Sequence, residues 1–583
     1  MLLDTIPERF LRAARLDDVR DAGRISVRVA GHSLAIFFHD GRVHAVDNRC
    51  PHMGFPLHRG TLRDGILTCH WHHARFDLES GGTFDQFADE ARVFPVEVRD
   101  GEVWVDLSPR EDRPGYLRQR LNDGLERNIS LVVAKSAIGL LGSGEDPAEP
   151  FRAGLEFGAR YRRAGWGQGL TMHACMMNLL PYLRTEDRPR ALYHGLTAVS
   201  RDSAGQPPRF SLRPLPTERI GLATLKGWFR RFVEVRDGEG AERCIVSAIR
   251  AGADDIQMAD MLFCAATDHR YLDLGHVLDF TNKAFEALEV AGWSHAEAVL
   301  PSLAEGYANA RRMEESNSWR NPVDLVEVLD DAFERLPNAI ERGRDRRGGW
   351  ERGEELATVL LGEDGGTTIA GALLEALEEG ATEEDLAGAV AYAAALRIAR
   401  FPTTNEFGDW DTALHTFTFS NAVCQGLRRA PSRELLRGVF DAAMSVHLDR
   451  FLNVPPARVP GPQGSEASPE DVLGDLRMLL DRRQGVDEAG ELVASYLHSG
   501  GWADRLLAAM GGLLLREDRN FHTIQAVEAA FAQHARLRDT TAGAHVLVAA
   551  ARYLAAHSPT MRSQEQTYDI ARRLSRGEIL YEE

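Results

Sequence analysis

Four residues with metal-binding side chains lie in two short segments near the start of the chain. The first segment carries Cys50 and His52, and the second, sixteen residues further on, carries Cys69 and His72. A centre with two irons can be held by two thiolates on one iron and two imidazoles on the other. Because neutral imidazoles replace anionic thiolates, its reduction potential is higher than that of an all-cysteine cluster. We therefore predict a 2Fe-2S cluster that these four residues bind and that handles electrons one at a time.

The surroundings favour this cluster over a zinc site, which more often uses paired Cys-x2-Cys motifs. Nearby glycines permit the tight loops that wrap a cluster: Gly54, Gly60, Gly65, Gly81 and Gly82. The run CPHMGFPLHRGTLRDGILTCHWHHARFDLESG, from Cys50 to Gly81, resembles the soluble Rieske ferredoxins and the Rieske domains of ring-hydroxylating oxygenases. The resemblance covers residues 1–108 and implies an electron-transfer role for this part of the chain.

A few positions depart from other Rieske proteins. Respiratory Rieske proteins carry an extra cysteine in each cluster loop, whereas Phe55 and Trp71 stand at the corresponding positions here, so no loop disulfide is expected. Ala74 stands where those proteins place a hydroxyl donor, and fewer hydrogen bonds to the sulfurs lower the potential. We expect a value near the low end of the Rieske range, roughly -150 mV or somewhat above. His73 stands where the family commonly has glycine.

Short alternating apolar segments on both sides of the motif predict an antiparallel β domain that ends near Leu107. The predicted strands are 25–29, 34–38, 43–46, 93–98 and 103–107. Asp100-Gly101 between the last two is a strong hairpin signal. A charged, proline-bearing linker follows at residues 109–115.

From residue 116 onward, Ala, Leu, Glu and Arg recur at helical spacing, which predicts an all-α domain over residues 116–583. Thr382 followed by Glu383, Glu384 and Asp385 predicts the capped start of a long alanine-rich helix. Loop-like stretches at 202–216, 343–353 and 455–469 divide the domain. The fold class is therefore α+β and multidomain, with repeated helical blocks at about 116–205, 217–342, 354–455 and 470–583.

Histidines recur in these blocks at similar places, each expected to open the second helix of its block. They are His173, His276, His415 and His522, with His194 and His545 about one helix after the first and the last of them. Three interpretations stay open: a duplicated packing unit whose imidazoles bond to backbone, a non-haem metal site at a common axis, and a pocket with acid or base histidines. Side-chain nitrogens from at least three blocks around one metal position would support the metal site.

The oxygenases that the first domain resembles pass electrons to a mononuclear non-haem iron, but their catalytic-domain ligands cannot be carried over. No Asp/Glu-x2-His-x4-His segment is present: Asp273 and His276 begin one, yet Thr281 stands where the second histidine belongs. The histidine-headed blocks also resemble the questin-oxidase-like helical proteins in arrangement, without a motif specific enough to transfer residues. Catalytic residues are thus not assigned, and a second iron site is expected to have a different architecture.

Composition excludes several partner classes. The net charge is -19, from 68 basic and 87 acidic residues, which opposes binding to nucleic acid. No basic leader and no long apolar run is present, so we expect no membrane segment. Six cysteines in 583 residues are too few for a disulfide framework, which favours the cytoplasm.

The best interpretation is an oxidoreductase in which an external reductase or ferredoxin reduces the cluster and the α-domain uses the electrons, most plausibly to oxygenate a small organic substrate. One alternative is a ferredoxin-like protein whose helical domain binds a partner, and another is a redox sensor. Substrate, reductase and oligomeric state are not determined by the sequence, and a homo-oligomer stays open.

Overall fold

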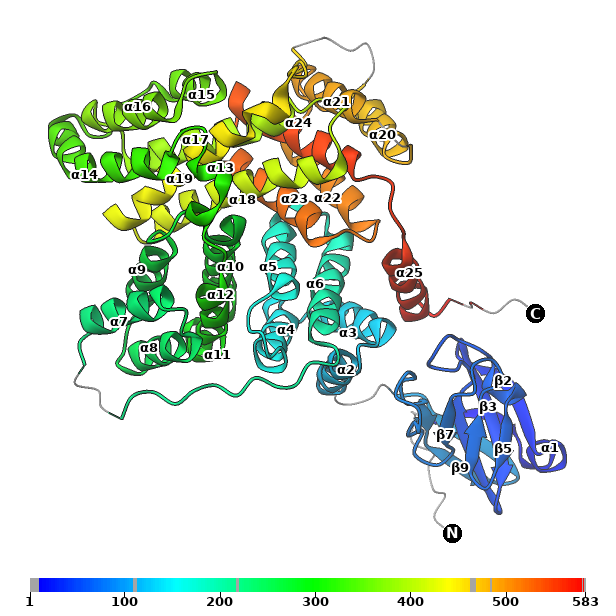
Figure 1. The fold of residues 1–583 in the computed structure, drawn as a ribbon. Coiled ribbons are helices and arrows are strands. Elements are labelled where there is room, and N and C mark those ends of the chain that lie inside the picture. Colours follow the sequence, from blue (N-terminus) through cyan, green and yellow to red (C-terminus); the bar gives the residue numbers. More distant parts are fainter. Residues whose placement is uncertain are drawn as a thin grey trace. The chain divides into compact units, whose positions relative to one another are not determined.

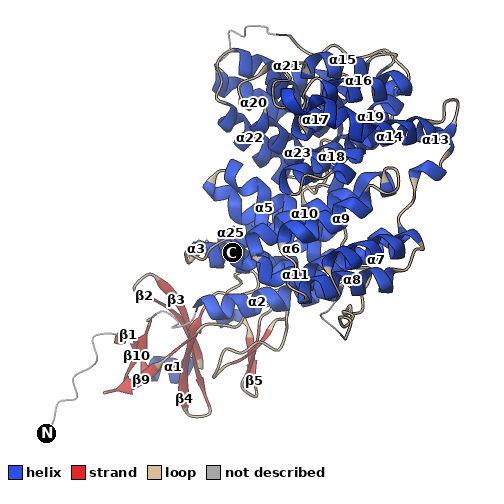
Figure 2. Ribbon diagram, turned by 90° about the vertical axis from the view of Figure 1, so that its left-hand side faces the viewer, coloured by secondary structure: helices blue, strands red, loops and turns tan. Residues whose placement is uncertain are grey.

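The computed structural model describes residues 10–108, 113–216, 220–461, 468–482, 485–578 and 580. The chain forms two compact units: unit 1 is Met1–Pro150 with Gln564–Glu583, and unit 2 is Phe151–Ser563. Among the described residues, every strand lies in the first 106 residues, and the rest of the regular structure is helical (Figures 1 and 2). The predicted fold class, an antiparallel β domain followed by a large helical region, is confirmed. The domain boundaries drawn from the sequence stay a prediction, and linker residues 109–112 lie outside the described residues.

Unit 1 contains three small antiparallel sheets, with strand orders β1-β10-β9, β2-β3-β4-β8 and β5-β6-β7. Their strands are β1 Phe10–Arg15, β2 Arg24–Val29, β3 His32–His39, β4 Arg42–Asp47, β5 Thr61–Arg63, β6 Ile66–Thr68, β7 Arg75–Asp77, β8 Val93–Phe94, β9 Val96–Arg99 and β10 Glu102–Asp106. A short helix, α1 Leu16–Ala22, follows β1. The sheet β5-β6-β7 holds the second metal-binding segment, because Cys69 directly follows β6.

The hairpin between β9 and β10 has the predicted turn chemistry. Asp100 and Gly101 have φ angles of 49° and 76°, and both central residues of a type I′ turn need positive φ. The expected single strand 93–98 is wrong, because Pro95 divides it. Proline has no N–H for a ladder hydrogen bond, so β8 pairs with β4 in one sheet and β9 pairs with β10 in another.

Helices complete unit 1 around the β domain. They are α2 Arg113–Arg127, α3 Ser130–Gly142 and, from the far end of the chain, α25 Ser563–Ser575. α2 and α3 pack against each other as a helical hairpin. The side chain of Leu574 lies against Gly54, and Arg49 reaches Gly577, so α25 covers part of the first metal-binding loop.

Unit 2 is built of helices of very different lengths. Their bounds are α4 Ala148–Tyr161, α5 Gln168–Leu179, α6 Arg188–Ser203, α7 Leu222–Glu234, α8 Gly238–Arg250, α9 Asp255–Ala266, α10 His276–Ala291, α11 Ala296–Val299, α12 Ala304–Asn309, α13 Asn317–Arg320, α14 Leu325–Gly343, α15 Gly353–Leu361, α16 Gly366–Glu378, α17 Glu383–Ala399, α18 Phe407–Arg429, α19 Arg433–Leu448, α20 Pro469–Leu479, α21 Val486–His498, α22 Ala503–Leu515, α23 Phe521–Arg536 and α24 Thr541–Ala556. The predicted capped start at Thr382 is confirmed: its side chain accepts a 3.1 Å hydrogen bond from the amide of Asp385 at the start of α17.

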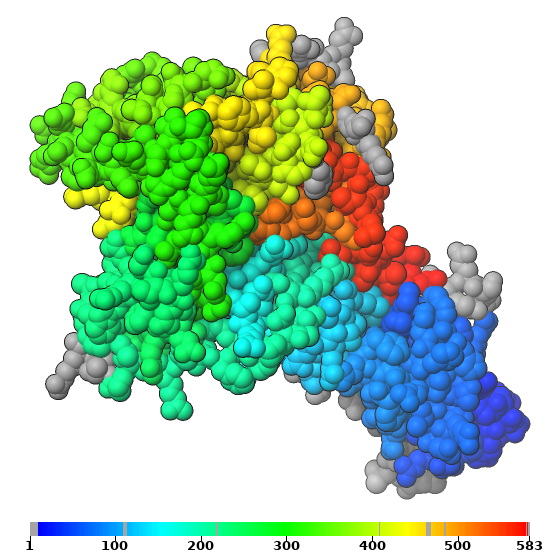
Figure 3. Space-filling view, viewed as in Figure 1, coloured from blue at the N-terminus to red at the C-terminus, as the bar shows by residue number. Residues whose placement is uncertain are grey.

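Four helices far apart in the sequence meet in the middle of unit 2. α18 packs against α10 and α23, and α5 packs against α10 and α23. Figure 3 shows the orange C-terminal helices sharing a surface with the cyan segment that contains α5 and α6. Each of the four helices carries one recurring histidine, but only His276 and His522 lie in a first turn. The expectation is wrong for His173 and His415, which lie inside α5 and α18.

None of the helices in the described part of the chain has both the length and the apolar character that a membrane crossing requires.

Candidate functional site

The two cysteines of the motif lie together under the loops that follow β4 and β6. Cys50 and Cys69 are 2% and 1% exposed, and their sulfurs hydrogen-bond to each other. This bond and burial raise the pKa of Cys50, while the same bond lowers the pKa of Cys69 to about 6. Amide N–H groups of His52 and Trp71 also point at the sulfurs. Such donors stabilise thiolates, which is the form that ligates iron.

The two histidines of the motif face each other beside the cysteines. The ring centroids of His52 and His72 lie 4.7 Å apart at 86°. The Nδ1 atom of His52 is buried without a partner among the described residues, and burial with Lys135 nearby lowers the pKa of this imidazole to about 4. A neutral imidazole with an unpaired nitrogen is suited to bind a metal. Two thiols and two imidazoles so placed fit the donor set of a 2Fe-2S cluster.

The two imidazoles differ in their surroundings. His52 packs edge to face against Phe87, and α3 covers its backbone. Lys135 on α3 donates to the carbonyl oxygens of Pro51 and His52, the latter at 3.0 Å, and it pairs with Asp89 at 3.0 Å. His72 is exposed. Sequence reasoning missed Lys135, because its position over the loop depends on the packing of α3.

His73 has a φ angle of 62°. This left-handed conformation favours glycine, which agrees with the expected family preference at this position. The imidazole of His73 is exposed, so a side chain is tolerated there at a cost in backbone strain.

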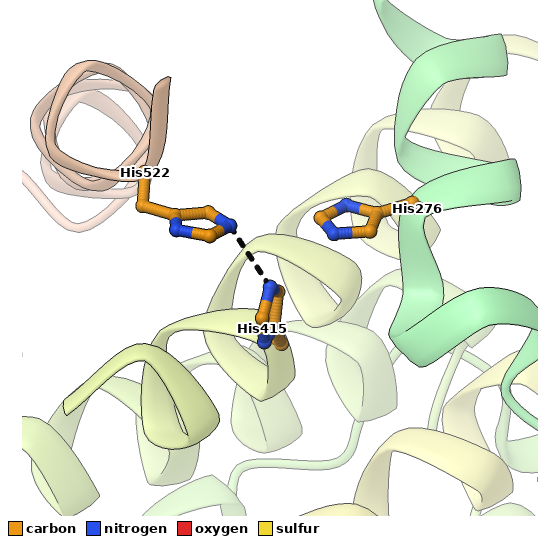
Figure 4. Close-up of side chains that lie close together, drawn as sticks. All are labelled: His276, His415 and His522. Carbon is orange, nitrogen blue, oxygen red and sulfur yellow. Dashed lines mark hydrogen bonds between the residues drawn. The ribbon is translucent and has the colours of Figure 1, made fainter. Parts of the chain in front are cut away.

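A second group of donor atoms lies in unit 2. His276, His415 and His522 come from α10, α18 and α23, and one nitrogen from each lies within 4.8 Å of the others (Figure 4). The Nε2 atoms of His415 and His522 are 3.1 Å apart. Two nitrogens that each lie about 2.1 Å from one metal ion are separated by about 3 Å or slightly more. Histidines from three of the four predicted blocks therefore converge, and His415 and His522 have the separation of two ligands on one metal ion.

Burial keeps these imidazoles in the form that binds metals. Burial, the other histidines and, for His276, Arg311 lower the pKa of His276 to about 4 and that of His415 to about 3. Both are therefore neutral at pH 7, and a neutral imidazole can accept a metal ion without first losing a proton.

The backbone before α10 is strained where it delivers His276. Tyr271, Asp273 and Leu274 have φ angles of 47°, 48° and 59°, and Gly275 has 91°. A Cβ atom at Gly275 would lie 2.7 Å from the Cβ of Phe419 on α18, so this position requires glycine. Each non-glycine residue in this region costs on the order of 1–3 kcal/mol, and such strain concentrates at functional sites.

A carboxylate that sequence reasoning missed orients His522. The Oδ2 atom of Asp411 lies 3.4 Å from Nδ1 of His522, and Tyr553 donates a 2.7 Å hydrogen bond to Oδ1. Burial raises the pKa of Asp411, but the hydrogen bonds from His522 and Tyr553 outweigh it and the pKa stays below its usual range. Carboxylate partners commonly fix metal-binding histidines in this way. The missed signal was the spacing of Asp411 and His415, which puts both on one face of α18.

The remaining recurring histidines lie elsewhere. Nε2 of His173 donates to the carbonyl of Phe151 at 2.9 Å, and the ring stacks on that phenyl group. His194 is buried on α6 and bonds to the backbone of Leu515. His545 hydrogen-bonds with the hydroxyl of Tyr392 at 2.9 Å. The structure therefore brings three of the six candidates together, and these other three have packing or hydrogen-bonding roles.

Comparisons with known proteins agree with the first site. The family model "Rieske [2Fe-2S] domain" matches residues 9–95. A human Rieske domain-containing protein is 30% identical over 113 residues, which is 16% of this chain and 72% of that protein. The ferredoxin component of the alkene monooxygenase system of Xanthobacter autotrophicus is 31% identical over 101 residues, 17% of this chain and 83% of its own. The solved Sphingomonas yanoikuyae B1 ferredoxin is 28% identical, with a TM-score of 0.16, covering 17% of this chain and 98% of that one.

Proposed function

Because the chain belongs to the Rieske [2Fe-2S] domain family through residues 9–95, and this domain binds a 2Fe-2S cluster, we propose that the protein is an oxidoreductase that receives single electrons from an external reductase or ferredoxin. In this proposal Cys50, His52, Cys69 and His72 hold the cluster. The proposed destination of the electrons is a metal site at His276, His415 and His522 in the helical unit.

The proposed contact point for the electron donor is the edge of the cluster loops at His72. Trp71 beside it is 37% exposed, and the two rings lie 4.7 Å apart. His52 is the less accessible ligand, because Phe87 packs on its ring and Lys135 holds its backbone carbonyl. A donor protein therefore reaches the cluster most directly through His72.

The observation that carries the proposal is the convergence of His276, His415 and His522. When bound there, an iron ion with three imidazole ligands has coordination positions left for small molecules. Asp411 holds the ring of His522 in place, and the strained backbone before α10 holds His276. These contacts arrange the nitrogens before a metal arrives, which reduces the ordering cost of binding it.

The reaction class that we propose is oxygenation of a small organic molecule. One oxygen atom of O2 enters a C–H bond to give C–OH, and the other leaves as water. The balance requires two electrons and two protons, and the electrons arrive singly from the reductase through the cluster. This chemistry needs a metal site as well as a cluster, which separates it from a simple electron carrier.

Metal analysis of the full-length protein tests the proposal. Anaerobically purified protein should contain about three irons and about two acid-labile sulfides per chain. His415→Ala should remove one iron and leave the sulfides and the electron-paramagnetic signal of the reduced cluster unchanged. His72→Cys should change that signal, because a neutral ligand becomes anionic. His498→Ala, at an exposed position, is the matched control and should lose nothing.

Two results would contradict the proposal. Wild-type protein with iron in the cluster alone, after reconstitution with ferrous iron, would remove the second metal site and favour a ferredoxin with a partner-binding helical domain. An unchanged cluster signal in His72→Cys would remove His72 from the ligands.

A further inference from the structure

A pocket of about 370 Å³ opens beside His415 in unit 2. This volume is within the range of small-molecule sites. The segment before α10, helices α13, α14 and α18, and the end of α19 line it. Its walls are mainly apolar and include Tyr271, Trp319, Leu325 and Leu448. The rings of Tyr271 and Trp319 are nearly parallel, at 27°, with centroids 6.3 Å apart, so the pocket has a flat aromatic side.

Two buried polar side chains line the same pocket. Asp449 is 6% exposed, and its Oδ2 atom accepts a 2.6 Å hydrogen bond from the hydroxyl of Thr416, the residue that follows His415. His447 is 7% exposed, and its Nδ1 atom is buried without a partner among the described residues. Because Nδ1 is closed to solvent, a ligand in the pocket can hydrogen-bond to His447 only through its other ring nitrogen, Nε2.

Burial favours the neutral forms of the pocket's polar groups. Burial raises the pKa of Asp449 to about 7, against the opposing effects of Thr416 and Arg397. Burial and the nearby Arg450 and Arg397 lower the pKa of His447 to about 4. Among the described residues that line the pocket, Arg450 carries the cationic group, and it is already engaged: it donates a 2.9 Å hydrogen bond to the carbonyl of His447 and lies 4.1 Å from the ring centre of Phe451. The pocket therefore suits a neutral ligand.

We propose that this pocket binds a small neutral hydroxylated aromatic molecule, with its hydroxyl at Asp449 and His447 and its ring along Tyr271 and Trp319. A hydroxyl both donates and accepts, so it can satisfy the two partners whichever of them carries a proton. His415 lines the pocket and also belongs to the three-histidine site, which is formed by His276, His415 and His522. The aromatic ring of the ligand therefore lies next to the proposed metal position. That this ligand is the substrate rests on the proposed function, whereas its binding in this pocket does not.

Calorimetric titration of the full-length protein with 2-naphthol tests the binding. The cluster is kept oxidised and no reductant is present, so no turnover is needed. We expect saturable binding of 2-naphthol, and at least about tenfold weaker binding of naphthalene, which lacks the hydroxyl. The anion 2-naphthoate and the cation of 2-naphthylmethylamine should also bind at least about tenfold more weakly.

Two variants connect binding to this pocket. His447→Phe keeps a flat aromatic ring and removes both ring nitrogens, and it should weaken 2-naphthol binding about tenfold while leaving naphthalene unchanged. Val323→Trp narrows the mouth from a residue that is 50% exposed, so the fold is kept and both ligands should bind more weakly. Val235→Trp, at a residue that is 64% exposed and outside the pocket, is the control.

The inference is overturned if naphthalene or a charged analogue binds as tightly as 2-naphthol, or if His447→Phe and Val323→Trp bind like wild type. Iron content measured on the same samples separates this failure from that of the proposed function. About three irons without 2-naphthol binding contradicts the pocket alone. Binding in protein whose iron is confined to the cluster contradicts the metal site alone.

Discussion

At the scale of single residues, the cationic side chain of Lys135 lies against the first cluster loop. Lys135 is 14% exposed at its side chain, contacts the backbone of both Pro51 and His52, and shares Asp89 with Arg120. Reduction adds one negative charge to a bound cluster, and a fixed positive charge nearby favours that state. The lysine therefore opposes the decrease in potential that Ala74 is expected to cause.

Replacing Lys135 with methionine should lower the reduction potential of the cluster by an amount on the order of tens of millivolts, because the nearby positive charge is lost while Asp89 remains. Lys135→Arg should keep most of the potential. Redox titration followed by paramagnetic resonance measures it. Lys226→Met, which breaks a 2.7 Å ion pair with Asp260 in unit 2, is the control. Equal potentials in Lys135→Met and wild type would show that this lysine holds the loop without tuning the cluster.

At the scale of elements, a buried charge network ties α10 to α5 and α23, and α10 and α23 also carry His276 and His522. Lys283 on α10 is 1% exposed and donates to Glu286 at 2.8 Å and to Glu528 on α23 at 2.6 Å. Asn178 on α5 donates to both carboxylates, at 2.7 and 2.9 Å. Each buried charge is paired within this network. The free-energy cost of burying a charge therefore appears only when one of its partners is removed.

Lys283→Met should destabilise unit 2 by about 3–5 kcal/mol, because it leaves two carboxylates buried without their cation. Chemical denaturation followed by far-ultraviolet circular dichroism measures this. The double variant Lys283→Met with Glu528→Gln should recover part of the loss. Arg538→Met removes an exposed ion pair with Asp504 and should cost at most about 1 kcal/mol. A loss in Lys283→Met no larger than that of Arg538→Met would contradict the network's role.

Features that depend on residues close together in the sequence could be predicted, whereas features that depend on how distant helices pack could not. The candidate cluster ligands and the Asp100-Gly101 hairpin are encoded within short segments, and so could be named without knowledge of the fold. His276, His415 and His522 could be named as candidates, but which histidines meet depends on how α10, α18 and α23 pack. His173 shows the limit, because it recurs in the same pattern and yet turns to the carbonyl of Phe151.

At the scale of the whole molecule, the interior of unit 2 buries many ionisable groups. Gly154 and Gly195 leave room for the ring of His173, where a Cβ on either would lie 2.6 Å from an imidazole nitrogen. Burial lowers the pKa of His173 to about 4 and, together with nearby Arg190, that of His194 to about 3. Neither belongs to the three-histidine site, so both affect stability with or without a metal.

Acidification should destabilise unit 2. Unfolding returns these imidazoles to their ordinary pKa of about 6.5, so below that pH the unfolded chain binds more protons than the folded one. Stability should be fully present above about pH 6.5 and fall toward pH 4, by roughly 1 kcal/mol for each of His173 and His194 at pH 5.5.

Denaturation at pH 7.5 and 5.5, followed by circular dichroism, gives the difference in unfolding free energy. In His173→Gln the pH dependence should become shallower, whatever the variant's stability at pH 7.5. His498→Gln, at an exposed position, should leave the pH dependence as it is. An unchanged dependence in His173→Gln would contradict the assignment.

Unit 1 is built from two segments far apart in the sequence, residues 1–150 and 564–583, so the first is synthesised long before the second. α25 covers the Gly54 loop through Leu574, and it leaves the ribosome only after the whole of unit 2 has been synthesised. The β domain can form early, but its cluster loop remains without this cover until the last helix emerges. The contact between Leu574 and the Gly54 loop is thus a late product of synthesis, and iron and sulfide can be inserted while α25 does not yet cover this loop.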